Sequence, residues 1–157
     1  MVVAIRTTKL IEFYNVTSST SYIPMFSLNA PSTPNTLYPV NDELIYMATA
    51  ENADPIYTLT YSAATNNWTW ENMPLTKSGS TANNFHSTID ACGRLWVSTH
   101  DYGIRIFNAQ GTQSLYNWTV STGLNSIALT KKFDLYAADQ DHNNLLSYLP
   151  GIKQCTS

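Results

Sequence analysis

The chain has 157 residues, a formal net charge of −3 and only 12% charged side chains. This length is enough for one domain with a hydrophobic core. The acidic balance and the scattered Lys and Arg argue against a nucleic-acid or anionic-membrane surface. Uninterrupted apolar runs reach only about five residues, which is too short to span a bilayer. Arg6 and Lys9 interrupt the apolar N-terminus before it reaches the length of a signal peptide.

Short apolar segments separated by turns run along the whole chain, and none shows the repeat of a long amphipathic helix. Period-two alternation and β-branched or aromatic residues favour strands at these segments. In the first half of the chain they form two units. The first unit is predicted to hold strands at Val2–Arg6, Leu10–Tyr14 and Ser21–Phe26, and the second at Thr36–Val40, Glu43–Ala50, Pro55–Tyr61 and Trp68–Glu71.

The second half repeats the same order of strands and turns in two further units. The third unit is the most complete, because apolar residues alternate clearly around Arg105 and turns with Gly separate its segments. Its predicted strands are Phe85–Ala91, Arg94–Thr99, Ile104–Phe107 and Gln113–Val120, and those of the fourth unit are Ser126–Lys131, Phe133–Ala138 and Asn144–Leu149.

The units recur at the size of a β-propeller blade. The apolar segment after the central turn begins at Leu10, Ile56, Ile104 and Leu145, so successive units recur roughly 40–50 residues apart. We therefore predict an all-β chain with about four consecutive four-stranded antiparallel blades. The whole of 1–157 is expected to be one propeller domain or a piece of one, with approximate blades at 1–28, 29–75, 82–124 and 125–157.

The first and last blades are each expected to lack one strand. The first begins without an inner strand, and the fourth has no convincing outer strand after Asn144–Leu149. Unpaired strand edges promote association, so we expect more chain or neighbouring copies to cover them, as in a larger ring. The alternative is a closed four-bladed ring in which the two chain ends pair.

One segment carries a family resemblance. Asp90-Ala91-Cys92-Gly93-Arg94-Leu95-Trp96-Val97, followed by Gly103-Ile104-Arg105-Ile106-Phe107, resembles the blade consensus of NHL-type propellers and their extracellular relatives. The segment with a cysteine before Arg-Leu-Trp-Val is also similar to the secreted royal-jelly/yellow family. The likeness is close in the third unit and loose elsewhere. It implies a propeller used as a binding platform, often outside the cell, and says little about the ligand.

Three N-x-[ST] sequons point to an extracellular location. They begin at Asn15, Asn67 and Asn117, which fall toward the predicted perimeter of the blades and outside the inner strands. Bulky glycans are tolerated at such exposed positions. We predict N-glycosylation at all three asparagines of a secreted or cell-surface protein.

Two cysteines are compatible with that location. Cys92 falls in the turn after an inner strand and Cys155 lies past the third strand of the fourth unit, which places both on the same predicted face. A bridge between them would close a long loop and constrain the unfolded chain. The alternatives are a buried free Cys92 and bridges to cysteines outside this sequence. Neither cysteine has the spacing of a metal or redox motif.

Polar side chains gather in the turns between second and third strands, which should project from one face of the blades. This candidate binding face comprises Glu51, Asp54, His100, Asp101, Asp139, Asp141 and His142. A metal site of His100, Asp141 and His142 is chemically allowed. Turns exposed to solvent are polar without any bound metal, which explains the same composition, so no metal or other cofactor is predicted.

Neither a nucleophile elbow nor a calcium-loop spacing is present in the sequence. Trp68, Trp70, Trp96 and Trp118 have rings that can stack on sugars, although packing is favoured for Trp96 and edge or glycan cover for Trp68 and Trp118. The predicted function is a non-catalytic structural or adhesive glycoprotein that assembles with copies of itself or with the rest of a larger extracellular chain. The alternatives are a closed propeller that binds protein or carbohydrate and a metal-dependent lactonase or hydrolase.

Overall fold

The structure, a computed structural model, describes residues 1–51, 54–76, 84–100, 102–119 and 123–148. Within these ranges the chain is all-β, with four antiparallel sheets and one short 3-10 turn at Pro74–Thr76. The strands are β1 (Val2–Ile5), β2 (Leu10–Ser18) and β3 (Ser21–Asn29) in the first sheet; β4 (Pro34–Asn41), β5 (Leu44–Thr49), β6 (Ile56–Ser62) and β7 (Asn67–Met73) in the second; β8 (Asn84–Ile89), β9 (Leu95–Thr99), β10 (Gly103–Phe107) and β11 (Ser114–Trp118) in the third; and β12 (Leu124–Leu129), β13 (Leu135–Asp139) and β14 (Asn144–Tyr148) in the fourth.

Each predicted strand is present, and each pairs with its neighbours in chain order. The main difference in length lies in the first sheet, where β2 and β3 have nine residues each. Pairing continues past the predicted end of β2 because Val16 lies opposite Tyr22, with a bulge after Phe13. Pro24 is tolerated within β3 because this strand lies at a sheet edge.

The turn between β8 and β9 shows why this motif folds as it does. The Asp90 carboxylate accepts hydrogen bonds from the backbone N–H groups of Cys92 and Arg94, both at 2.9 Å. Gly93 has a φ of +74°, which suits a residue without a Cβ. In the fourth sheet the hydroxyl of Thr130 takes the role of the Asp90 carboxylate and accepts the N–H of Asp134 at 3.1 Å.

Neighbouring sheets contact one another through equivalent strands. The innermost strands β4, β8 and β12 lie side by side, and the second strand of one sheet contacts the innermost strand of the next in the pairs β5 with β8 and β9 with β12. In the same way β1 contacts β4, so β1 occupies the position of a second strand. The first sheet therefore has no innermost strand among the described residues, as expected from the sequence.

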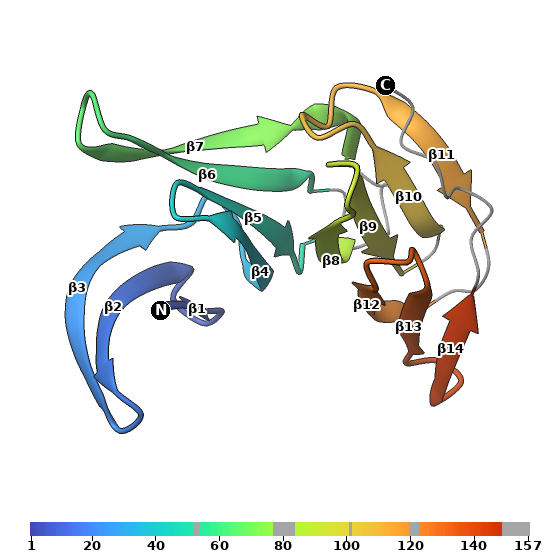
Figure 1. Cartoon of the computed structure of the whole chain (residues 1–157), viewed down its shortest axis with the longest axis horizontal. Coiled ribbons are helices and arrows are strands. Elements are labelled where there is room, and N and C mark those ends of the chain that lie inside the picture. The colour runs from blue at the N-terminus through green and yellow to red at the C-terminus, as the bar shows by residue number, and fades with distance from the viewer. Residues whose placement is uncertain (52–53, 77–83, 101, 120–122, 149–157) are drawn as a thin grey trace.

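The four sheets follow one another around an open arc, with the first and fourth sheets at its two ends (Figure 1). No strand of the first sheet is hydrogen-bonded to the fourth within the described part of the chain, so these strands do not close a ring. The all-β fold and the antiparallel sheets are thus confirmed. A propeller remains a proposal.

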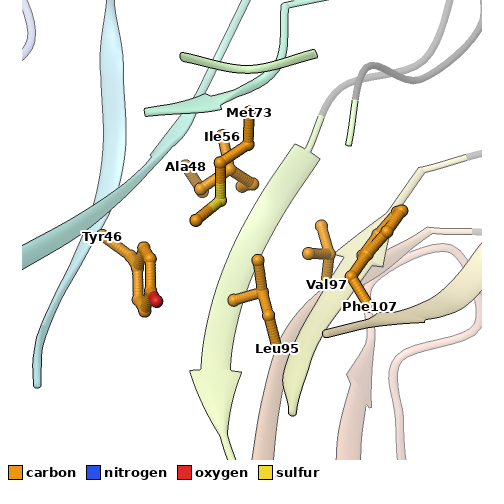
Figure 2. Close-up of a cluster of buried hydrophobic side chains, with 7 residues drawn as sticks. All are labelled: Tyr46, Ala48, Ile56, Met73, Leu95, Val97 and Phe107. Carbon is orange, nitrogen blue, oxygen red and sulfur yellow. The ribbon is translucent and has the colours of Figure 1, made fainter. Parts of the chain in front are cut away.

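Apolar clusters fill the spaces between the sheets. The cluster between the second and third sheets contains Tyr46, Ala48, Ile56, Met73, Leu95, Val97 and Phe107 (Figure 2). Strand β9 is buried on both faces, because Leu95 and Val97 point to the second sheet whereas Trp96 packs in the cluster with the fourth. Burial of this strand on both sides makes the third sheet the centre of the core.

Candidate functional site

Two carboxylates of the predicted binding face lie in the connection between β5 and β6 and contact the first sheet and the segment before β4. The Nζ of Lys9 lies 2.6 Å from Glu51 Oε1, and the Thr33 hydroxyl donates to the same oxygen at 2.5 Å. The Lys9 ammonium, followed by the Thr33 hydroxyl, lowers the pKa of the Glu51 carboxyl to about 2. Asp54 accepts a hydrogen bond from the hydroxyl of Ser32. These contacts join the first and second sheets.

The remaining described residues of this face lie between the third and fourth sheets. His100 Nε2 is 3.9 Å from Asp141 Oδ1, which brings two of the predicted residues together from different sheets. Gly123 lies between them, since its N–H donates to the His100 carbonyl at 2.6 Å. His142 Nδ1 is 2.9 Å from the carboxylate of Asp139, which is buried.

The seven predicted residues therefore fall into two groups and not into one convergent site. Glu51 and Asp54 belong to the first group, and the histidines with Asp139 and Asp141 to the second, while Asp101 lies outside the described residues. No three His, Cys, Asp or Glu side chains in the described ranges are arranged to hold a metal ion. The metal site considered for His100, Asp141 and His142 is not formed by these side chains.

All three sequon asparagines are exposed. Asn67 begins β7 and Asn117 lies in β11, so both are on outermost strands as expected. Asn15 lies within β2 and not after it, because pairing with β3 extends the strand to Ser18. None of the three lies on an innermost strand, and their glycosylation stays a prediction.

The structure describes only one of the two cysteines of the predicted bridge. Cys92 lies in the turn between β8 and β9, and its N–H donates to Asp90. Cys155 lies outside the described residues, so the bridge between the two cysteines stays a prediction.

Aromatic residues form a surface that the sequence did not single out. A groove of about 650 Å³ runs between the first sheet and the hairpin turns of the second. Its lining comes from the first sheet (Met1, Val2, Phe13, Tyr14, Met25, Phe26) and from the second (Pro39, Asn41, Asp42, Ile45, Tyr61, Asn66, Trp68). The β2–β3 and β6–β7 hairpins diverge toward their tips (Figure 1).

Four rings of the groove contact one another in succession. Phe26 stacks on Phe13 with ring centroids 4.3 Å apart, Phe13 lies 5.1 Å from Trp68, and Trp68 lies 5.4 Å from Tyr61. The cross-strand pairing of Phe13 with Phe26 in the β2–β3 hairpin sets the first contact. This pair could in principle be predicted by counting residues from the turn of the hairpin. The count must allow for the bulge at Met25, however, because this bulge shifts the register.

The other tryptophans of the chain serve packing. Trp96 is fully buried, as predicted. Trp118 packs against the same cluster, and Trp70 packs between the first and second sheets, where its Nε1 donates to the Asn29 carbonyl at 3.0 Å. Trp68 is thus the indole that borders the groove.

Neither a protein-family model nor a curated protein matches the chain. In the described part of the structure, no helix is long and apolar enough to cross a membrane.

Proposed function

We propose that the chain is a non-catalytic structural or adhesive glycoprotein outside the cell, built from propeller-type blades that associate with copies of itself or with the rest of a larger chain. The likeness of Asp90–Val97 to NHL-type and extracellular propellers supports the blade interpretation. The pairing of Glu51 with Lys9 and of Asp139 with His142 supports a structural role for the acidic turns. The main support comes from the two ends of the arc.

The exposed face at the far end of the fourth sheet carries this proposal. In the third sheet Trp96 and Ile104 are fully buried against the fourth sheet. The register makes Tyr136 and Leu145 their equivalents one sheet further on. These two side chains are 41% and 74% exposed. The fourth sheet thus presents to solvent the face by which the third sheet packs on its neighbour.

The opposite end of the arc also presents exposed apolar side chains, beside Glu12, which lies opposite Val3. Val2 and Ala4 pack toward the second sheet, so the alternation of a strand turns Val3 and Ile5 to the other face. Val3 is 36% exposed, and the edge of the first sheet adds Tyr22 at 61%. Sheet-on-sheet cover of such surfaces is favourable at about 25 cal/mol per Å² of apolar area removed from water.

Strand β1 also has an edge to which another strand can add. Met1 and Tyr14 exchange hydrogen bonds in both directions, each at 2.8 Å. The antiparallel pattern then directs the N–H and C=O groups of Val2 and Ala4 away from β2. Among the described strands, β1 pairs with β2 alone. Edges of this kind promote strand addition between chains.

Sedimentation velocity over a range of concentrations of the 157-residue chain tests the proposal. We expect concentration-dependent association that Leu145→Arg weakens at least about tenfold, since an arginine cannot enter an apolar sheet interface without its charge being desolvated. Leu115→Arg is the matched control, because Leu115 is 43% exposed on the perimeter strand β11. A compact monomer at micromolar concentration, or equal losses in both variants, would overturn the proposal.

A further inference from the structure

We propose that the groove between the first and second sheets binds a neutral oligosaccharide. This inference does not rest on association of the arc, because the groove lies between two sheets of one chain and is complete without a partner. It concerns a ligand, whereas the proposed function concerns assembly. Three properties of the lining support it: the contacting aromatic rings, the polar side chains at its rim and the lack of an excess positive charge.

The contacting rings of Phe26, Phe13, Trp68 and Tyr61 give the groove an aromatic wall. Phe13 and Phe26 are stacked nearly parallel, with centroids 4.3 Å apart and an interplanar angle of 15°, so each covers one face of the other and leaves the second face of Phe26 for a ligand. Phe26 is 38% exposed, although a phenyl ring gains free energy from burial. The C–H faces of pyranose rings are apolar and flat, and stacking on aromatic rings removes both surfaces from water.

Polar side chains on the turns of the second sheet lie beside these aromatic rings. Asn41 accepts the Glu43 N–H at 2.8 Å, and Asn66 accepts the Tyr61 hydroxyl at 2.7 Å. These bonds engage the amide oxygens and orient the two side chains, whose NH₂ groups are donors. Asp42 supplies a carboxylate acceptor. Sugar hydroxyls both donate and accept, so one ligand can satisfy all three groups.

The charges of the lining select against other ligands. Within the described residues no Lys, Arg or His side chain borders the groove, and the Met1 ammonium is balanced by the Asp42 carboxylate, so the lining has no excess positive charge to favour phosphate, sulfate or nucleic acid. Proline-rich peptides also bind aromatic grooves. Their prolines lack N–H donors, however, so such a peptide offers fewer hydrogen bonds to the Asp42 carboxylate than a sugar does. A neutral polyhydroxylated ligand fits the whole lining better.

Glycosylation of Asn67 is compatible with this site. Asn66 and Trp68 border the groove, and the period of two along a strand turns the side chain of Asn67 to the opposite face of β7. A glycan carried there projects away from the groove. The chain's own glycan therefore leaves the groove open to a separate oligosaccharide.

Isothermal titration of the full chain with neutral hexasaccharides of glucose, mannose and N-acetylglucosamine tests the proposal, with the tryptophan fluorescence of the chain as a second readout. We expect saturable binding of at least one of them, weakened at least about tenfold by Phe26→Ala and by Asp42→Ala. Both side chains are exposed, so these variants should retain the strand signal in circular dichroism. Tyr116→Ala is the control, because Tyr116 is 50% exposed on β11, outside the groove.

Three outcomes would overturn the proposal. The first is absence of saturable binding of all three hexasaccharides at millimolar concentration. The second is binding that Tyr116→Ala weakens as much as Phe26→Ala does. The third is a proline-rich peptide that binds in a Phe26-dependent way while the sugars do not, which would assign the groove to peptides.

Discussion

The indole N–H of Trp96 donates a hydrogen bond to the carboxylate of Asp90 at 2.9 Å. Trp96 is fully buried between the third and fourth sheets, and Asp90 is 8% exposed. The same carboxylate accepts the Arg94 Nε at 2.6 Å. One acidic side chain thus fixes the turn after β8 and satisfies the polar atom of the largest buried ring.

Replacement of this carboxylate should be strongly destabilising. Asp90→Ala removes the acceptor of the buried Trp96 N–H, of the Arg94 Nε and of two backbone N–H groups, and we expect the free energy of unfolding to fall by about 3–5 kcal/mol. Thr130→Ala at the equivalent turn of the fourth sheet is the control, with an expected loss of about 1 kcal/mol, because the bonds of that hydroxyl are exposed. Urea denaturation measures both, and equal losses would contradict a special role for Asp90.

A side chain at Gly123 should lower the free energy of unfolding. Its φ is +68°, and a Cβ built there would lie 2.4 Å from Asp141 Cγ. Gly123→Ala therefore combines backbone strain of about 1–2 kcal/mol with a steric clash. The control is Gly93→Ala, which has a similar φ but no atom within 4 Å, so strain alone is expected.

A second substitution separates the two effects at Gly123. Removal of the opposing carboxylate in Gly123→Ala/Asp141→Ala should restore stability toward that of Asp141→Ala, leaving only the strain. The measurement is the denaturant midpoint of the four variants. If the double variant is as unstable as the sum of the two single variants, the clash with Asp141 is not the cause.

The Glu51 carboxyl should titrate well below its ordinary pKa. Its folded-state pKa is lowered from 4.5 to about 2, first by the hydrogen bond from Lys9. The ionised form therefore stabilises the fold above the unfolded pKa near 4.5, and this contribution is lost as the pH falls through about 2. Both side chains are 46% exposed, so the effect on stability is small.

Nuclear magnetic resonance titration of the Glu51 side chain measures this shift directly. In Lys9→Gln the pKa should rise toward 4.5, whereas in Lys132→Gln, which lies in the turn between β12 and β13, it should not move. An unchanged pKa in Lys9→Gln would show that Thr33 or another group controls the carboxyl.

The extracellular proposal predicts glycans at Asn15, Asn67 and Asn117. All three side chains are exposed on strands other than the innermost ones, so a glycan meets no packed surface there. Mass spectrometry of peptides from natively sourced protein should show hexose and N-acetylhexosamine mass at each site. Unmodified masses at all three sites would remove the argument for secretion.

Much of the strand arrangement could be predicted because it depends on local chemistry. Alternation around Arg105 and the Asp90–Gly93 turn define strands and hairpins from neighbouring residues alone. The long β2–β3 pairing was missed, because cross-strand contacts such as Val16 with Tyr22 continue a hairpin beyond the segment that looks apolar in sequence. The turn at Thr130 uses a hydroxyl as acceptor where the turn at Asp90 uses a carboxylate. A consensus sequence for the blade does not reveal that these two residues have the same role.

The candidate sites were harder to predict than the strands. Sequence reasoning placed the polar turns on one face but did not separate Glu51 with Lys9 from His100 with Asp141, since these partners lie 42 and 41 positions apart. The aromatic groove was missed for the same reason, because Phe13 and Trp68 come into contact only when the first and second sheets pack.

By itself the sequence determined the all-β class, the position of the strands and the repeat of four units, because period-two patterning and turn residues act over a few neighbouring positions. Only the tertiary structure decided that the sheets form an open arc, that Tyr136 and Leu145 face solvent, and where the aromatic groove opens. These features depend on packing between side chains far apart in the chain, and a local pattern carries no information about which faces meet.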